Sequence, residues 1–396
     1  MPGADYMKIT ADVSCRIADS FRVAQVRGMF DLPLGCGSEE HFSVEVPDLE
    51  EDWQIGLIVG PSGSGKTTIA RQAFGAAMPV TGRPVGQTGG MSVPQWPADR
   101  AVIDCLGDAD IRQLTRVLAA VGFSSPPAWL RPYHVLSNGE KFRCDLARLL
   151  LNDCKSSISD CKNDCNSSIS DFQSPLVVMD EFTSVVDRTV ARLGSAALAG
   201  AIRGGAIARR FVAVSCHYDI VPWLCPDWVV DMATQSLARG KLPREDIRLD
   251  IRSCDKGLWA MFKRHHYLNG NLPACVRCHV GLVENEPVAF AAIAPVAGYR
   301  GYQRFSRVVV LPDYQGIGIG GKFRDAVAAL EAPRCRRLSL MTSHPAMIRS
   351  LAHSARWRLR SVGFSHPDAA GLNAPADACR SRRVCSFVWI NDYTKM

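Results

Sequence analysis

The chain of 396 residues lacks any apolar run of the roughly 18 residues that a membrane-spanning helix needs. Its longest apolar run, from Val288 to Ala297, is short enough to be a strand. The N-terminus also lacks the basic segment and long apolar segment of a signal peptide. These absences argue against a membrane-bound or secreted protein. We therefore expect a cytoplasmic protein with no membrane partner.

A disulfide framework is also not indicated, because the 15 cysteines are odd in number and a cytosolic protein keeps them reduced. Cys275-Val276-Arg277-Cys278-His279 matches a haem-attachment pattern, but the segment alternates like a strand. A metal site formed by Cys275 and Cys278 with His265 or His266 remains an alternative.

Positive charge is unevenly distributed along the chain. From Asp246 to the C-terminus, 22 Lys and Arg residues stand against 11 Asp and Glu residues, although the whole chain carries only +7. Such asymmetry indicates a polyanionic partner, and a nucleic acid, either DNA or tRNA, is our expectation. A solvated basic surface beside a coenzyme A site explains the same composition.

A glycine-rich loop at residues 60–68 lies between an apolar run, Ile55 to Val59, and a predicted helix that starts near Ile69. A strand, such a loop and a helix form the usual context of a phosphate-binding loop, where backbone N–H groups surround the phosphates. Lys66 would reach the β- and γ-phosphates of ATP, and the Thr67 hydroxyl would hold Mg²⁺. The expected ATP contacts of this loop are Gly60, Ser62, Gly63, Gly65, Lys66, Thr67 and Thr68.

Further polar residues follow predicted strands. Asp180 and Glu181 end the apolar run 176–179, and we expect Asp180 to hold Mg²⁺ and Glu181 to polarise the attacking water. Gln95 and His217 also end short strands. Gln95 is a further Mg²⁺ ligand candidate, and His217 is a candidate γ-phosphate contact.

Taken together, residues 20–235 resemble the nucleotide-binding domain of ABC ATPases. The turn Leu136-Ser137-Asn138-Gly139-Glu140 is similar to the family signature, with Asn138 and Glu140 as departures. The resemblance implies that Ser137 and Gly139 contact ATP held by another subunit, and hence a homodimer formed through this domain. The predicted ABC-type domain is 1–240. It includes an 11-residue tandem repeat in 152–173, which we expect to be a mobile surface insert.

A second strand, glycine-rich turn and helix occur near residue 315. The run Phe305 to Pro312 leads into Gln315-Gly316-Ile317-Gly318-Ile319-Gly320, and a helix is predicted from Phe323 to Glu331. Backbone N–H groups at such a turn suit a pyrophosphate. A dinucleotide site is one interpretation.

The pattern Gln-x-x-Gly-x-Gly instead resembles the acetyl-CoA loop of GNAT acyltransferases, and the resemblance covers about 250–390. It implies that acetyl-CoA, or another acyl-CoA, contacts Gln315, Gly316, Gly318 and Gly320. The family often carries a catalytic tyrosine on a late helix, where this chain has Trp357. By residue type, His265, His266 and Tyr267 are the candidates for acyl transfer, and His344 is a weaker one.

The predicted fold class is therefore α/β, with an ABC-type P-loop domain followed by a GNAT-fold acyltransferase domain at 241–396. The segment His265 to Leu268, with the run 310–316, is similar to Mom-like DNA-modification proteins. The leading hypothesis is an ATP-hydrolysing ATPase coupled to N-acylation of a nucleic-acid base. The alternatives are a protein or small-amine acetyltransferase with a regulatory ABC dimerisation module, and a non-enzymatic ATP-driven switch or transporter ATPase subunit.

Overall fold

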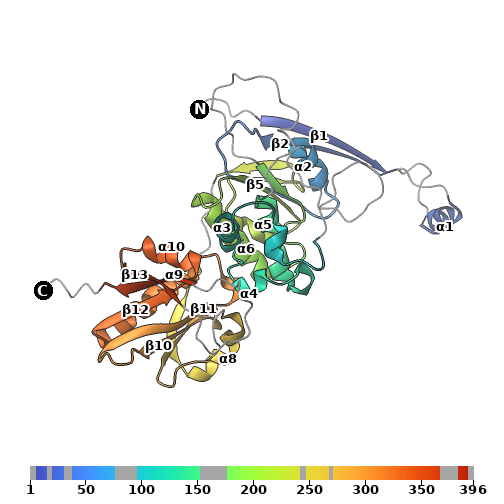
Figure 1. Cartoon of the computed structure of the whole chain (residues 1–396). Coiled ribbons are helices and arrows are strands. Elements are labelled where there is room, and N and C mark those ends of the chain that lie inside the picture. Colours follow the sequence, from blue (N-terminus) through green and yellow to red (C-terminus); the bar gives the residue numbers. More distant parts are fainter. Residues whose placement is uncertain are drawn as a thin grey trace. The chain divides into compact units, whose positions relative to one another are not determined.

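The computed structural model describes residues 6–15, 20–30, 38–75, 96–151, 176–240, 247–266, 271–365 and 382–390. Its fold is α/β with mixed sheets. The chain forms two compact units, and each is discontinuous in sequence (Figure 1). Unit 1 comprises Met1–Gln95, Asp153–Asp187 and Ile207–Arg244, and unit 2 comprises Trp96–Asn152, Arg188–Ala206 and Glu245–Met396.

These units differ from the two predicted domains, because two helical segments of the first half belong with the C-terminal part. Hydrogen bonds between residues far apart in the sequence explain why these helical segments belong to unit 2. The backbone N–H of Ser124 donates to Gln315 Oε1 at 2.9 Å, and Arg143 Nη1 donates to Asp313 Oδ1 at 3.1 Å. The segment that carries the signature-like turn is therefore part of unit 2.

Unit 1 contains a five-stranded sheet in the order β4-β5-β3-β6-β7. The first four strands are parallel and β7 is antiparallel to β6. Every residue of β3 is buried, as expected for a parallel strand covered on both faces. The bounds are β3 (Ile55–Val59), β4 (Leu176–Met179), β5 (Arg210–Ser215), β6 (Trp228–Asp231) and β7 (Ser236–Arg239).

A helix and a two-stranded antiparallel hairpin complete the core of unit 1. Phe74, Trp53 and Trp228 pack as a cluster of aromatic rings between these elements. Gly56 lies against this cluster, and a Cβ there would come within 2.0 Å of the Trp228 ring. The remaining elements are β1 (Tyr6–Cys15), α1 (Phe21–Phe30), β2 (Ser38–Pro47), α2 (Lys66–Phe74), η5 (Tyr218–Ile220) and α7 (Val221–Leu224).

Unit 2 begins with a group of helices. Leu114, Val117 and Leu118 form the buried face of α3, as their helical spacing predicts. Asp110 caps α3 by accepting hydrogen bonds from the N–H groups of Arg112 and Gln113. These elements are η2 (Val102–Cys105), α3 (Ile111–Ala120), α4 (Pro126–Trp129), η3 (Tyr133–Val135), α5 (Asn138–Leu151) and α6 (Arg188–Arg203).

The rest of unit 2 is a seven-stranded sheet in the order β13-β14-β12-β11-β10-β9-β8. Of the neighbouring pairs, β11 and β12 are parallel and the others are antiparallel. The strands are β8 (Asp250–Cys254), β9 (Arg277–Val283), β10 (Glu286–Pro295), β11 (Tyr302–Val310), β12 (Arg337–Thr342), β13 (Trp357–Ser365) and β14 (Arg382–Trp389).

Short helices cover both faces of this sheet. Along β10, Ala289 and Ala291 belong to the cluster with α9 and α10, whereas Phe290 and Ala292 belong to the cluster with α8. This alternation follows from the two-residue period of a strand. The helical elements are η6 (Lys256–Leu258), α8 (Trp259–Phe262), η7 (Lys263–His265), η8 (Pro312–Tyr314), α9 (Ile319–Glu331), η9 (Ala332–Arg334) and α10 (Pro345–Ala352).

Trp357 corrects one expectation, because it begins β13 and does not lie on a helix. Its side chain is buried, and the indole Nε1 donates to Asp325 Oδ1 at 2.8 Å. It is therefore a core residue of unit 2. The helix α8 in the same unit is short and is flanked by the 3₁₀ turns η6 and η7.

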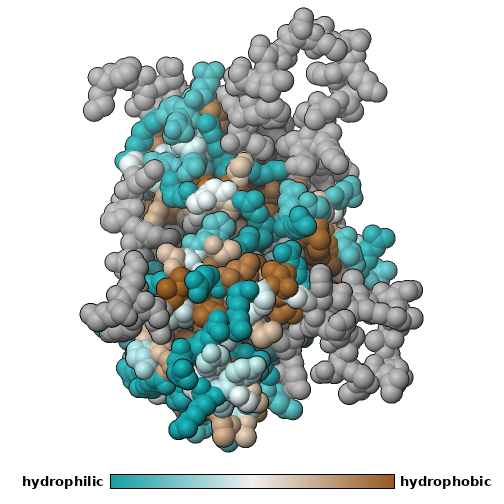
Figure 2. Space-filling view, turned by 60° about the vertical axis from the view of Figure 1, so that its left-hand side comes forward, coloured by the Kyte–Doolittle hydropathy of each residue, from teal (hydrophilic) through white to brown (hydrophobic). Residues whose placement is uncertain are grey.

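Within the described ranges, none of the helices is both long and apolar enough to cross a bilayer. Single large apolar side chains are nevertheless exposed, among them Leu130 and Val185. On the face in Figure 2, hydrophobic residues lie in separate groups among hydrophilic ones. Scattered exposure of this kind is usual for a folded protein.

Candidate functional site

The 60–68 loop of unit 1 connects β3 to α2, as predicted. Gly60, Gly63 and Gly65 have φ values of 157°, 83° and 78°, which favour glycine. A Cβ on Gly65 would lie 2.7 Å from the Phe42 ring, whereas one on Gly63 would meet nothing within 4 Å. The loop is thus packed against the hairpin at one glycine and open at another, which leaves its backbone accessible to a ligand.

Two polar side chains of this loop are hydrogen-bonded within unit 1. Lys66 Nζ donates to the carbonyl oxygens of Gly60 and Pro61, at 2.9 Å and 2.6 Å. Thr67 Oγ1 donates to Asp180 Oδ2 at 2.9 Å. A hydroxyl beside a carboxylate at the start of a helix is the oxygen donor set that Mg²⁺ prefers in ATP sites. Ser62 is exposed and Thr68 half-buried.

Asp180 and Glu181 follow β4 directly. The Glu181 N–H donates to Asp180 Oδ1 at 2.9 Å, and Glu181 itself is exposed with a φ of 54°. His217 follows the neighbouring strand β5, and its N–H donates to Ser215 Oγ at 3.2 Å. Because β4 and β5 are parallel neighbours, both residues lie at the same edge of the sheet.

Two predicted parts of the ATP site are not brought to this loop within unit 1. Gln95 lies outside the described residues. Ser137 and Gly139 belong to unit 2, at the start of α5. There the Ser137 N–H donates to Glu140 Oε2 at 2.9 Å and the Glu140 N–H donates to Ser137 Oγ at 3.3 Å, which is a capping box.

The second glycine-rich turn, residues 315–321, leads from η8 into α9. Gly316 and Gly318 have φ values of 86° and 87°, and Gly318 is the N-cap of α9. A cavity of about 360 Å³ lies beside the turn, and Gln315, Gly316, Gly318 and Gly320 all line it. The unpaired N–H groups at the start of a 13-residue helix suit an anionic group such as pyrophosphate.

Gln315 also has a structural role that the sequence did not reveal. Its Nε2 donates to the Val310 carbonyl at 2.9 Å, while its Oε1 accepts from the Ser124 N–H. His344 Nε2 lies 3.1 Å from the Ser124 carbonyl oxygen. The connection between α3 and α4 is therefore fixed against the turn, and Ser124 and His344 line the same cavity.

His265 and His266 both line this cavity, and Tyr267 lies outside the described residues. Burial lowers the pKa of His265, and the Arg264 guanidinium lowers it further, against smaller opposing effects of Glu140 and Asp313. Arg264 Nε lies 3.0 Å from His265 Nε2. Both effects favour the neutral form of the imidazole.

His344, the weaker candidate, is half-buried and lines the same cavity. Burial lowers its pKa, although the hydrogen bond with Ser124 opposes the shift. His266 is less suited to proton transfer than His265, because its ring packs edge-on against Trp259 at 5.7 Å between centroids. Both His344 and His265 are half-buried, but His344 is held by the Ser124 carbonyl and His265 lies beside Arg264.

A metal site near Cys275 does not form among the described residues, where no group of three His, Cys, Asp or Glu side chains could hold an ion. Cys278 belongs to the cluster around Trp259. The next residue, His279, lies on the other face of β9 and its Nε2 is 3.0 Å from Glu331 Oε1. The Cys278 and His279 side chains therefore cannot bind the same metal ion.

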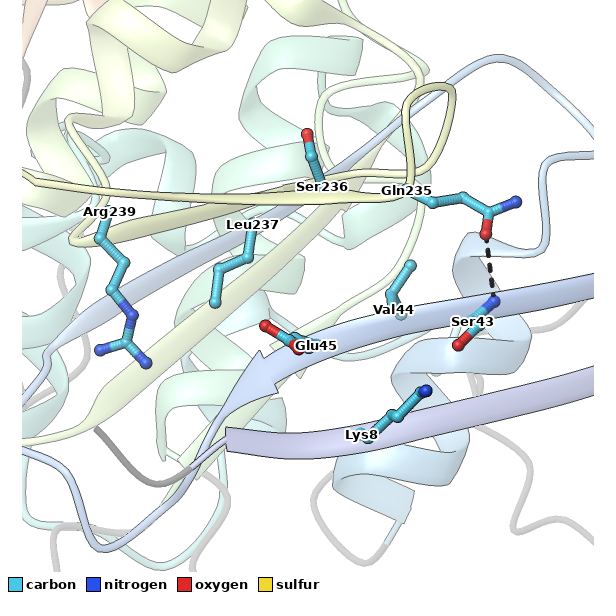
Figure 3. Close-up of a pocket in the computed structure, with 8 residues that line it drawn as sticks. All are labelled: Lys8, Ser43, Val44, Glu45, Gln235, Ser236, Leu237 and Arg239. Atoms are coloured by element: carbon cyan, nitrogen blue, oxygen red, sulfur yellow. Dashed lines mark hydrogen bonds between the residues drawn. The ribbon is translucent and has the colours of Figure 1, made fainter. Parts of the chain in front are cut away.

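Unit 1 also contains a cavity of about 550 Å³ between its hairpin and β7. Lys8 on β1, Glu45 on β2 and Arg239 on β7 supply its charged side chains, and the Ser43 N–H donates to Gln235 Oε1 (Figure 3). No residue of the 60–68 loop lines it. This cavity is therefore separate from the 60–68 loop.

No protein-family model and no curated protein matches the chain. Among solved structures, an IAA acetyltransferase from Bacillus cereus ATCC 14579 is 14% identical, with a TM-score of 0.28 over 36% of this chain and 99% of its own. A GNAT family acetyltransferase from Elizabethkingia anophelis with acetyl-CoA bound is 13% identical, with a TM-score of 0.29 over 36% of this chain and 98% of its own.

One further solved structure is of a different kind. A bacterial Atm1-family ABC exporter with ATP bound is 17% identical, with a TM-score of 0.33 over 51% of this chain and 36% of its own. All these scores are too low to carry an argument, so the functional assignment depends on the geometry of the two glycine-rich turns.

Proposed function

We propose that the chain is an acyl-CoA-dependent N-acyltransferase that also binds and hydrolyses ATP, and that its acceptor is a nucleic-acid base. The carrying observation is the cavity beside the 315–321 turn. It combines the N-terminus of α9, two glycines with left-handed backbone and a half-buried histidine, His265. Anion binding and proton transfer are thus available at one place.

In this proposal acetyl-CoA is the donor substrate, with its pyrophosphate against the start of α9. His265 would take the proton of the attacking amine. The N–C bond forms as the thioester C–S bond breaks, and the sulfur leaves with a proton as coenzyme A. His344, held by Ser124, would orient the donor without taking part in the transfer.

The ATPase part of the proposal rests on the contact between Thr67 Oγ1 and Asp180 Oδ2. These oxygens would hold Mg²⁺, with the 60–68 loop around the phosphates and Glu181 at the attacking water. We propose a homodimer formed through the ATP-binding part of the chain. ATP would then drive a change of conformation and would not donate the transferred group.

A direct experiment incubates the full chain with labelled acetyl-CoA, ATP and Mg²⁺, and with DNA, tRNA, a lysine peptide or spermidine as acceptor. Label on a nucleic acid that falls steeply with added salt supports the proposal. Label on the peptide or amine alone supports a protein or small-amine acetyltransferase. Acetyl-CoA that neither binds nor reacts contradicts the acyltransferase assignment altogether.

A further inference from the structure

A second cavity in unit 2 shares His265 with the cavity beside the 315–321 turn. It has a volume of about 390 Å³, which is within the usual range for a small-molecule site. Its walls come from α4, the start of α5 and the segments η7 and η8. The polar residues on these walls are Arg131, Ser137, Glu140, Arg264, His265 and Asp313.

The acidic groups of this second cavity are held in place by neighbours. Glu140 Oε2 accepts from the Ser137 N–H at 2.9 Å, and Asp313 Oδ1 accepts from Arg143 Nη1 at 3.1 Å. Arg143 is only 1% exposed, so this support is rigid. The carboxylates are therefore preorganised acceptors for an amino group.

The two arginines of the cavity, Arg131 and Arg264, are both exposed, and neither is held by an ion pair among the residues that the structure describes. A guanidinium with unpaired donors suits a carboxylate or a phosphate. The apolar part of the wall, with Met261 and Leu311, adds contact area for the body of a ligand.

The contact between Arg264 and His265 adds a functional link. Arg264 Nε points its hydrogen at His265 Nε2, 3.0 Å away, and so occupies the lone pair that a proton acceptor needs. An anionic group that binds Arg264 competes for the same guanidinium. A bound anion would thus release the imidazole at the moment when the acceptor is in place.

We infer that this second cavity is the acceptor site, and that it takes a small group carrying both an amine and an anion. The signature-like turn at Ser137 and Glu140 is then one wall of the acceptor site. Arg131 and Arg264 bind the anion, the Glu140 and Asp313 carboxylates receive the amine, and His265 stands between donor and acceptor. This inference rests on the proposed acyltransferase function and specifies its acceptor.

The transfer step balances without a further reactant. The amine nitrogen attacks the thioester carbon, His265 takes one proton from that nitrogen, and the C–S electrons leave with the sulfur. Two sources supply the required chemistry: a nucleotide, either free or within a nucleic-acid strand, and a free amino acid. A base with an exocyclic amino group can enter such a cavity only when it is out of its stack.

Calorimetric titration of the full chain tests the inference. Acetyl-CoA is titrated first, and then dAMP, a 12-nucleotide single strand containing adenine, and glutamate, each in the presence of coenzyme A. We expect at least one of these three probes to bind. Arg131→Ala and Arg264→Ala should each weaken that probe at least tenfold and leave acetyl-CoA affinity unchanged.

Arg112→Ala is the matched control, because Arg112 is an exposed arginine on α3 that lines neither cavity. It should bind all ligands as the wild type does. If acetyl-CoA binds but none of the probes does, or if the two variants bind the probe normally, the acceptor site is wrong and the acyltransferase proposal stands. If acetyl-CoA itself fails to bind, both are wrong.

Discussion

Asp313 is joined to the buried Arg143 by two hydrogen bonds. Nη1 donates to Asp313 Oδ1 at 3.1 Å, and Nη2 donates to the Asp313 carbonyl at 3.0 Å. The two residues are 170 positions apart in sequence. Arg143 lies on α5 and Asp313 lies two residues before the 315–321 turn. The helix that begins with the signature-like turn is therefore connected directly to the predicted coenzyme A loop.

Replacing Asp313 by alanine should destabilise unit 2, because it leaves the Arg143 guanidinium buried without its carboxylate. We expect a loss of about 1.5 kcal/mol in the free energy of unfolding, measured in urea, because the carboxylate itself is half-exposed and the bond to the Asp313 carbonyl remains. Asp108→Ala removes an exposed carboxylate and should cost no more than about 0.5 kcal/mol. Equal losses for both variants would contradict the role of the ion pair.

Gly316→Ala and Gly318→Ala should differ, although both glycines have left-handed backbone. A Cβ at Gly316 would lie 2.7 Å from Gly122 Cα and 2.9 Å from Ala197 Cβ, whereas one at Gly318 meets nothing within 4 Å. Both variants share a backbone cost of about 1 kcal/mol. Because of these close contacts, we expect Gly316→Ala to lower the melting temperature clearly more than Gly318→Ala does.

Binding data separate the two glycine variants further. Gly318→Ala should remain folded but bind acetyl-CoA more weakly, because its methyl group projects at the anion site. The circular dichroism spectrum serves as the control for folding. If Gly318→Ala binds acetyl-CoA as tightly as the wild type, the N-terminus of α9 is not the pyrophosphate site.

The pH dependence of acyl transfer should show whether His265 is the general base. Because burial and Arg264 lower the pKa of His265, the acid limb of kcat/KM should lie below that of an ordinary histidine. Arg264→Ala removes a positive neighbour and should shift this acid limb towards higher pH. Glu140→Gln removes a negative neighbour and should shift it the other way. A limb that is unchanged in both variants would exclude His265 as the base.

Variants of the proposed ATP site should affect ATP binding and ATP hydrolysis separately. Thr67→Ala and Asp180→Asn remove the oxygens expected at Mg²⁺ and should weaken Mg²⁺-dependent ATP binding at least tenfold. Glu181→Gln should bind ATP normally and hydrolyse it at least a hundredfold more slowly. Filter binding and phosphate release distinguish these effects. Normal turnover by Glu181→Gln would disprove its predicted role.

Glu331 is a buried charge outside both cavities, at the end of α9. Burial raises its pKa, but hydrogen bonds from Arg277 Nε at 2.7 Å and His279 at 3.0 Å outweigh this effect and leave the pKa below 4.5. The Glu331 carboxylate thus binds a proton less readily in the native state than in the unfolded chain. Its stabilising contribution is present above about pH 4.5 and is lost as the pH falls through the lowered value.

Glu331→Gln should therefore destabilise the protein by about 3 kcal/mol at pH 7 and by less at pH 3. Urea unfolding at the two pH values gives the comparison. Glu286→Gln is a suitable control, since Glu286 is an exposed glutamate of the same unit. A loss that is independent of pH would show that the Glu331 charge is not responsible.

The strands and helices next to the two glycine-rich turns were predictable from the sequence, because they depend on residues close together in the chain. The apolar run of β3, the glycines of the 60–68 loop and the helical spacing after Gly318 are all encoded within short segments. The strand before each turn and the helix after it are confirmed. Trp357 was placed wrongly because a single aromatic residue between two arginines gives no periodicity that distinguishes a strand from a helix.

The contacts that join distant segments were not predictable from local patterns. Ser124 and Gln315 are separated by 191 positions, and no periodicity or motif links them. Arg143 reads as an ordinary charged position of an amphipathic helix, yet it is 1% exposed. Only the packing of the helical segment against the seven-stranded sheet gives these residues their roles.

The central claim is that the cavity beside the 315–321 turn binds an acyl-CoA. Calorimetric titration of acetyl-CoA into the full chain measures this directly, with Gly318→Ala as the comparison. The account predicts saturable binding of one acetyl-CoA per chain in the wild type and at least tenfold weaker binding in Gly318→Ala. No saturable binding by the folded wild-type protein, or equal affinity for both proteins, would contradict it.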